Sequence, residues 1–323
     1  MRVCRLTCSL LICVACGCSC LSRNAAGYIA VEDLIPDLSH FVQVAPENKE
    51  SRAKLFAQLI IQPHPEIYQR TDIFKTDLPS LELYLDGLTA YLPAINVLHA
   101  RFEEQRESIE TNFLNLFPDF DSKKMKICLM LSLFRFDGKI PHDNPRMLLL
   151  GMDGLAKFHG QSVSLPVIVS HELFHLYHFQ VNPLPRDTDY VGLYRLVWQE
   201  GLATYVSQVL NPGTSLSDIL LDPRLANEGP RFIPAIASSL QRDFNSTDDA
   251  TAGLYLSYRR GGLVPSRMGY LIGYEIARRA AADHSLVELA RLRGESLSSL
   301  VRSETAALAT GASQASKPVK HSD

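Results

Sequence analysis

The spacing of apolar residues predicts a long amphipathic helix in the first third of the chain. Apolar positions recur at intervals of three, four and seven residues, and charged positions fall on the other side: Ile95, Leu98, Phe102, Ile109, Phe113 and Leu116 against Glu103, Glu104, Arg106 and Glu107. We expect this helix to span about residues 92–117 and to stop at Pro118. The surrounding pattern over residues 28–120 is also mainly helical and indicates a helical N-terminal layer.

Two short apolar runs then interrupt the helical pattern. They are KMKICLMLSLF (residues 124–134) and RMLLLGMD (residues 146–153), joined by the turn-rich RFDGKIPHDNP. Short runs of branched and aromatic residues between turn signals are typical of buried strands. We therefore predict two neighbouring strands of a small sheet.

Helical periodicity returns after Gly160. It predicts helices over about residues 166–180, 190–210, 234–244 and 267–282, followed by shorter pieces up to residue 302. From Ala306 the chain is rich in Ala, Ser, Thr and Lys without a period, which predicts a disordered tail over residues 306–323. The predicted fold class is α+β, mostly helical, with a small sheet and a catalytic core over residues 121–305.

The composition fits a globular protein and argues against nucleic acid as a partner. The chain has 323 residues, of which 46% are hydrophobic, enough for a sizeable core. The formal net charge of −3 comes from interspersed charges of both signs, with no basic stripe of the kind that a phosphate backbone requires.

Cysteine usage points to export. Six of the seven cysteines lie in MRVCRLTCSLLICVACGCSC, an apolar run behind two arginines that is too short to span a bilayer and has the layout of a signal peptide over residues 1–20. Small residues before Cys16 and Cys18 resemble the lipobox of bacterial lipoproteins, which implies a lipid anchor; plain secretion or periplasmic release is the alternative. We expect a periplasmic or cell-envelope location and, with Cys128 as the one remaining thiol, no internal disulfide.

The stretch LPVIVSHELFHLYHFQ places polar residues in an apolar helix. His171 and His175 are four residues apart, so they lie on one helical face and can reach a single tetrahedral zinc ion. Glu172 follows His171 directly, so it projects from an adjacent side of the same helix. From there its carboxylate can take a proton from a water molecule beside the ion. The alternative is a pair of core histidines satisfied by hydrogen bonds.

A third ligand is expected on the next helix. His178 is about 10 Å along the axis from His171, too far to share an ion with it, so we expect His178 to pack or to support the site. Glu200, in LVWQEGLATYVSQVL, is a carboxylate in an apolar segment and needs a partner, which zinc supplies. A solvent-exposed glutamate at a helix start is the alternative. We further expect Gly201 to allow the close approach of a neighbouring helix or of the substrate, and Thr204 to hydrogen-bond a histidine ligand.

The pair HELFH and WQEGLATY resembles the gluzincin metallopeptidases, in which H-E-x-x-H is followed by a glutamate ligand within W-x-x-E-G-x-A. Residues 125–282 also look like a bacterial domain family described as predicted zinc-dependent proteases. The resemblance implies a zincin-like core with one zinc ion, held by His171, His175 and Glu200, and Glu172 as the base. Thr204 departs from the pattern, because thermolysin-like enzymes carry an aspartate there.

The same family implies a donor for the oxyanion and a place for the substrate. Tyr270 and Tyr274, one turn apart in VPSRMGYLIGYEIARR, are the two candidates for the donor, and the alternative is an aromatic stripe in the core. We prefer Tyr270, because Tyr270 with Gly273 resembles the Y-x-x-G near the active site of gluzincin aminopeptidases. Arg267 is a candidate for binding a substrate carboxylate, but an exposed arginine at a helix start is the favoured interpretation from the sequence. The run LLLGMDG precedes the predicted zinc helix, as an edge strand does in zincins. Its segment GMDG, with Asp153 as the acidic residue, distantly resembles the loop that holds a free amino terminus in gluzincin aminopeptidases.

These features predict an exported zinc metallopeptidase that acts on a peptide or protein and is tethered to the membrane through an N-terminal lipid. Two alternatives remain open. One is a zinc-fold binding module at the cell surface without turnover, and the other is a metal-dependent hydrolase of a non-peptide amide or ester. The oligomeric state is not determined by the sequence.

Overall fold

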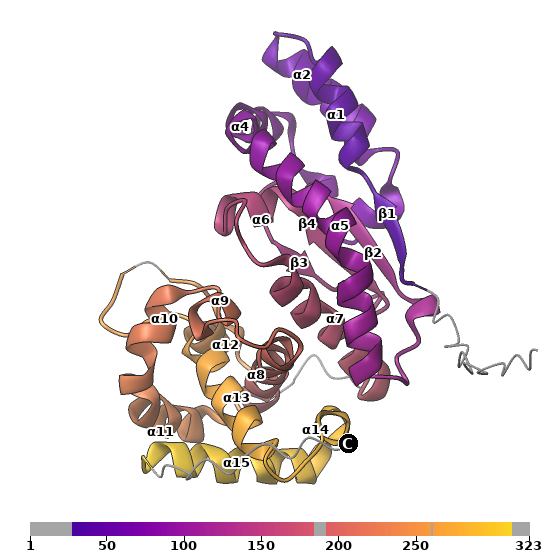
Figure 1. Cartoon of the computed structure of the whole chain (residues 1–323). Helices are drawn as coiled ribbons and strands as arrows, with labels where there is room; N and C mark the ends of the chain where they lie inside the picture. The colour runs from indigo at the N-terminus through magenta and orange to yellow at the C-terminus, as the bar shows by residue number, and fades with distance from the viewer. Residues whose placement is uncertain (1–27, 184–191, 260, 312–323) are drawn as a thin grey trace, which may run out of the picture.

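The computed structural model describes residues 28–183, 192–259 and 261–311 (Figure 1). The predicted signal peptide, with Cys16 and Cys18, lies outside these residues. In Figure 1 the sheet and the helices that precede α7 form the upper part of the molecule, and helices α8 to α15 form the lower part. No helix in the described part of the chain is both long and apolar enough to cross a membrane.

The sheet has four strands in the order β1-β2-β4-β3. Strands β1 (Ala30–Asp33), β2 (Lys126–Met130) and β4 (Met147–Gly151) pair in parallel, and β3 (Gly138–Lys139) pairs antiparallel with β4. The prediction that β2 and β4 are neighbours is confirmed. Both are buried along almost their whole length, as expected for parallel strands covered on both faces.

One strand of the sheet was not expected, and one expectation about the sheet is wrong. Strand β1 lies in the segment that is mainly helical, as predicted, and its four residues are too few to show a period. Strand β4 is not an edge strand, since β3 covers its outer side. The short β3 is the edge of the described sheet that lies beside α7 (Leu165–Val181), and its two residues have a composition typical of a turn.

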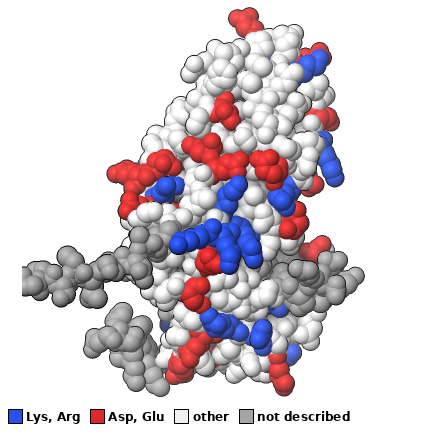
Figure 2. Space-filling model, turned by 90° about the vertical axis from the view of Figure 1, so that its right-hand side faces the viewer, with Lys and Arg blue, Asp and Glu red and all other residues white. Residues whose placement is uncertain are grey.

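The helices of the N-terminal layer pack around this sheet. They are α1 (Ile35–Val44), α2 (Lys49–Phe56), α3 (Pro65–Tyr68), α4 (Leu78–Leu88) and α5 (Leu92–Leu116). The long predicted helix is confirmed as α5, which buries Ile95, Leu98 and Phe102 and contacts α7. Figure 2 views the molecule from its right-hand side in Figure 1 and shows acidic and basic side chains in adjacent groups. An ion pair joins β1 to β2, with Lys126 Nζ 2.9 Å from Glu32 Oε2.

Asp153 organises the loop that leads to β3. It lies in α6 (Met152–Phe158), is fully buried and accepts hydrogen bonds from the backbone N–H groups of Ser132 (2.6 Å) and Phe134 (2.8 Å) and from the Tyr84 hydroxyl (3.1 Å). These bonds hold a loop in which Leu133 and Phe134 adopt left-handed backbone angles. The Asp153 carboxylate is therefore used by hydrogen bonds within the fold. The family resemblance suggested that it holds a substrate amino terminus, and this expectation is wrong.

The lower part of the molecule is a helical layer. Its helices are α8 (Leu193–Leu210), α9 (Leu216–Ile219), α10 (Pro223–Glu228), α11 (Ile233–Asp243), α12 (Asp249–Leu256), α13 (Met268–Ala280), α14 (Leu286–Arg291) and α15 (Gly294–Ala309). Helix α15 buries Thr305 and Leu308, so the prediction of a disordered tail is wrong for residues 306–309, which belong to this helix. Residues 312–323 lie outside the described part.

Helices α8 and α13 cross at two glycines. A Cβ atom at Gly201 would overlap the backbone of Gly273, and one at Gly273 would overlap the carbonyl oxygen of Val197. Only glycine therefore permits this distance between the two backbones. Of the two occupants considered for the space at Gly201, a helix or a substrate, the structure shows the helix.

Candidate metal centre

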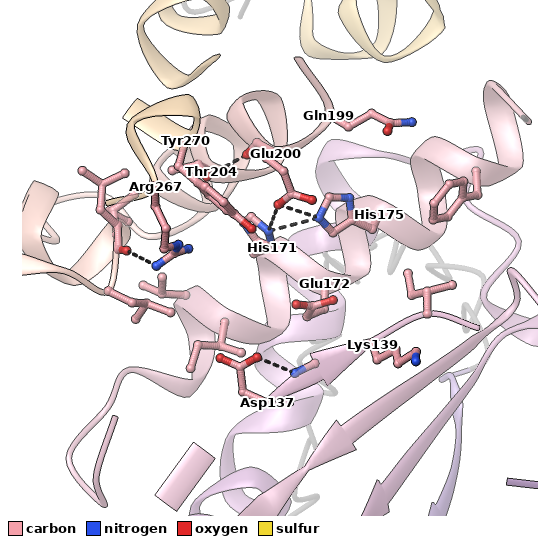
Figure 3. Close-up of a pocket in the computed structure, with 18 residues that line it drawn as sticks. Asp137, Lys139, His171, Glu172, His175, Gln199, Glu200, Thr204, Arg267 and Tyr270 are labelled. Atoms are coloured by element: carbon pink, nitrogen blue, oxygen red, sulfur yellow. Dashed lines mark hydrogen bonds and ion pairs between the residues drawn. The ribbon is translucent and has the colours of Figure 1, made fainter. Parts of the chain in front are cut away.

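The two histidines of the motif lie side by side on α7 (Leu165–Val181). This helix contacts α5, α8 and β4, which explains why its sequence is apolar on nearly all sides. His171 and His175 have their Nε2 atoms 3.1 Å apart, and 17% and 13% of their side chains are exposed. Both face the pocket shown in Figure 3.

Helix α8 brings Glu200 to the same point. Glu200 Oε2 lies 3.4 Å from His171 Nε2 and 3.5 Å from His175 Nε2, so three ligand atoms surround one position. Two ligands at about 2.0–2.1 Å from a tetrahedral zinc ion are themselves about 3.3–3.4 Å apart. The observed separations of 3.1–3.5 Å therefore fit one zinc ion held by this donor set.

The protonation states of two ligands also suit a cation. Burial alone raises the pKa of Glu200, but the adjacent His175 and His171 outweigh it and hold this pKa well below its usual range. Burial, together with the neighbouring His175, lowers the pKa of His171. At neutral pH the site thus offers an ionised carboxylate and an unprotonated imidazole, the forms that bind metals.

His175 differs from His171 in its response to the same surroundings. Burial lowers its pKa, but the negative charges of Glu200 and Glu172 outweigh this effect and raise it above the usual value. A bound cation would take the place of that proton, because both occupy the lone pair that faces Glu200.

Glu172 lies between the histidines and strand β3 (Figure 3). Burial, together with the negative charges of Asp137 and Glu200, raises the pKa of Glu172 to about 7 despite the opposing effect of His175. A Cβ atom at Gly138 of β3 would lie 2.5 Å from Glu172 Oε1. The backbone of β3 therefore packs directly against this carboxylate, and glycine is the residue that leaves room for it.

The pocket around these residues has a volume of about 290 Å³. Its wall combines residues of β3, α7, α8, the segment of α9 and the start of α13. The polar residues that line it are Asp137, Lys139, His171, Glu172, His175, Gln199, Glu200, Thr204, Arg267 and Tyr270.

Only one of the two candidate tyrosines lines this pocket. The Tyr270 ring stacks near that of His171, with centroids 6.4 Å apart and planes at 19°, and burial with the charge of Glu200 raises its pKa, so the hydroxyl keeps its proton. Tyr274 instead donates to Gln208 Oε1 (2.6 Å) and packs against Tyr205. The structure therefore brings Tyr270, and not Tyr274, to the metal ligands.

His178 lies apart from the three ligands, as expected. It is buried, its ring packs on Phe174 with centroids 5.5 Å apart, and its Nε2 lies 3.5 Å from Asn182 Nδ2. Thr204 does not support a histidine. Its hydroxyl donates to the backbone oxygen of Glu200 (2.7 Å), one turn earlier in α8, so the expected contact with a ligand is wrong.

Two pocket residues had no signal in the sequence. Asp137 pairs with His159 (Oδ2 to Nε2, 2.6 Å) and accepts from the backbone of Gly138 (2.8 Å), and the next residue, Lys139, belongs to β3. They lie in RFDGKIPHDNP, which has the composition of a turn. Only the pairing of β3 with β4 brings them into the same pocket as the histidines of α7.

A second group of potential ligands, Glu32, His64 and Glu66, lies near the sheet edge formed by β1. Here Lys126 already pairs with Glu32, and His64 Nε2 lies 3.2 Å from Asp37 Oδ2. Ion pairs within the group account for its geometry without a metal.

The arrangement at the first site combines three ligand atoms, a carboxylate with a pKa near neutrality and a neutral phenol around one pocket. This set can hold a Lewis acid and can move a proton beside it. In comparisons with protein-family models, curated proteins and solved structures, the chain has no match.

Proposed function

We propose that the protein is a zinc-dependent peptidase with a zincin-like core. The observation that carries the proposal is the convergence of His171, His175 and Glu200 on one point, at separations that suit tetrahedral zinc. Glu172 borders the same point but is not among the three ligands. This leaves one carboxylate to bind the ion and another to handle protons.

A zinc ion, when bound, lowers the pKa of water to near neutrality and polarises a carbonyl group. Glu172 then accepts a proton from the attacking water and later delivers it to the leaving amine. Its pKa of about 7 suits both directions of transfer at neutral pH. The protonated Tyr270 hydroxyl donates a hydrogen bond to the substrate oxygen as negative charge develops there.

The sheet edge supports a peptide as the substrate. Strand β3 borders the pocket and forms the last strand of the described sheet, with Gly138 next to Glu172. An extended peptide can pair with such an edge through its backbone, which holds a scissile amide beside the carboxylate. An ester or other small amide would not use this edge.

The direct test replaces Glu172 by Gln. The variant keeps all three ligands, so we expect zinc content equal to that of the wild type and a fall of at least about a hundredfold in the rate of peptide hydrolysis, because no base remains. Metal analysis and mass spectrometry of a mixed peptide library measure the two quantities. Glu200→Ala serves as the metal control and should lose zinc.

Two results would reject the proposal. Full activity of Glu172→Gln contradicts the assigned base. A wild-type protein that holds one zinc ion but cleaves no peptide supports the alternative of a binding module without turnover.

A further inference from the structure

Arg267 occupies the pocket wall beside the metal ligands. It precedes α13, has a left-handed backbone (φ 57°) and is partly buried. Its guanidinium carbon lies 4.0 Å from the centroid of the Tyr270 ring, and Nη1 donates to the backbone oxygen of Leu220 (3.2 Å). Figure 3 shows the side chain extending from α13 toward the pocket. Tyr270 thus has Arg267 against its face and stacks near His171.

This guanidinium has no carboxylate partner among residues 28–183, 192–259 and 261–311. The acidic groups of the pocket have other roles, because Asp137 pairs with His159 and Glu200 faces the two histidines. A partly buried guanidinium offers five N–H donors in a planar fork, of which one bonds the backbone oxygen of Leu220 and another interacts with the Tyr270 hydroxyl. The remaining donors make Arg267 a site for an anion that the chain itself does not supply.

We propose that Arg267 binds a carboxylate of the substrate and thereby selects peptides that carry one near the scissile bond. The inference rests on the proposed peptidase function. A carboxylate matches the planar fork of arginine through two parallel hydrogen bonds, an arrangement that a lysine ammonium cannot provide. The terminal carboxylate of a peptide and the side chain of an acidic residue have this same chemistry.

The position of Arg267 limits where that carboxylate lies. The Tyr270 ring lies 4.0 Å from the guanidinium carbon and 6.4 Å from the His171 ring, so the guanidinium is close to the ligands. An extended peptide advances about 3.3–3.6 Å per residue. The selected carboxylate therefore belongs to one of about three residues on one side of the cleaved bond.

Lys139 provides a comparison on another wall of the pocket. It belongs to β3 and its Nζ lies 5.8 Å from the Phe136 ring centroid, on the far side of Glu172 from Arg267 in Figure 3. If general attraction of anions were responsible, loss of either positive charge would weaken binding of acidic peptides. Specific binding by Arg267 predicts that only its loss removes the preference.

The test measures binding without turnover, in the zinc-loaded Glu172→Gln protein. The probes are acetyl-tetraalanine with a free carboxyl terminus, the same peptide as an amide, and amides with a single glutamate at each position in turn, all titrated by calorimetry. We expect the free acid or one glutamate peptide to bind at least about tenfold more tightly than the plain amide, consistent with a charged bidentate hydrogen bond. Which of them does so identifies the source of the carboxylate.

Variants then assign the preference to Arg267. We expect Arg267→Gln to abolish it, Arg267→Lys to retain only part of it, and Lys139→Gln to leave it intact. Arg231, which is exposed and does not line the pocket, serves as a second control, and Arg231→Gln should also leave the preference intact. Zinc content and thermal unfolding of each variant check the fold. Equal affinity for acid and amide, including no binding of either, overturns the inference, as does a preference that survives in Arg267→Gln. Failure of the wild type to cleave peptides rejects the peptidase proposal separately.

Discussion

Glu172 and Glu200 are two carboxylates in one pocket with opposite pKa shifts. Glu200 lies within 3.5 Å of two imidazoles, which outweigh the effect of burial and keep it ionised. Glu172 faces β3 and the charge of Asp137, so burial dominates and its pKa rises to about 7. Environments that separate two pKa values in this way fit the proposed function, in which Glu200 binds the metal and Glu172 transfers protons.

His178 is expected to make the protein sensitive to acid through its burial. Burial, with the positive charges of His175 and Arg195, lowers its pKa to about 3, whereas the unfolded chain has a value near 6.5. Between these values the unfolded state binds the proton and the native state does not, so stability is lost as the pH falls below 6.5 and the loss levels off near pH 3. From pH 7 to 4.5 this amounts to about 2–3 kcal/mol.

Chemical denaturation of the metal-free protein across this pH range measures the effect. The variant His178→Gln removes the titrating group and keeps a polar side chain, so its free energy of unfolding should fall less steeply with acid. Identical slopes for wild type and variant would show that His178 is not the responsible group.

Residues whose roles follow from helical spacing could be predicted from the sequence. His171 and His175 were expected on one face, and the structure places their Nε2 atoms 3.1 Å apart. Glu200 required a contact between two helices, which the apolar character of its segment and the family resemblance indicated. Tyr270 was preferred to Tyr274 only through the family resemblance, because both fall on similar faces of α13 and the packing against α8 is what distinguishes them.

At the scale of elements, strand β3 determines where Glu172 can lie. Gly138→Ala adds a methyl group that would lie 2.5 Å from Glu172 Oε1, so the carboxylate or the strand must move. We expect a fall of about tenfold to a hundredfold in the rate of peptide hydrolysis, because small displacements of a catalytic group are costly. Zinc content should not change, because none of the three ligands lies on β3.

Steady-state kinetics and metal analysis of Gly138→Ala test this expectation. Gly160→Ala is a suitable control for loss of a glycine elsewhere, since a Cβ atom there meets no neighbour within 4 Å, although its φ of 77° adds local strain. Unchanged kinetics in Gly138→Ala would mean that β3 does not hold Glu172 in place.

Long elements were easier to predict than short ones. The helices that became α5, α7, α8 and α13 have several turns each, and the structure places their ends within a few residues of the expected ones. Strands β1 and β3 have four and two residues, too few for a periodic pattern. Because β3 was missed, β4 was expected at the edge and Asp137 and Lys139 were not recognised as pocket residues.

At the scale of the whole molecule, the metal site joins the two parts seen in Figure 1. Two ligands come from α7 and the third from α8, on either side of residues 184–191. A zinc ion bound here stabilises the native state by about 4 kcal/mol when its free concentration is a thousand times the dissociation constant. Its removal by a chelator should therefore lower the melting temperature by roughly 10 °C.

Calorimetry with and without chelator measures this difference in melting temperature, and added zinc should restore the higher value. The change in melting temperature caused by the chelator should be smaller in Glu200→Ala than in the wild type, whereas in His178→Gln it should be the same. A melting temperature that does not respond to chelator, in protein shown to have lost its zinc, would contradict a metal link between the two parts.

The glycine contact between α8 and α13 also fixes when the site can form during synthesis. Glu200 is adjacent to Gly201, whose backbone neighbour Gly273 is translated much later. Until the ribosome has released residues 268–280, α8 lacks the surface it packs on and Tyr270 does not exist in the chain. A nascent or truncated product that ends before α13 carries the H-E-x-x-H motif but lacks both Tyr270 and the helix on which α8 packs, so under the proposed function it should be inactive.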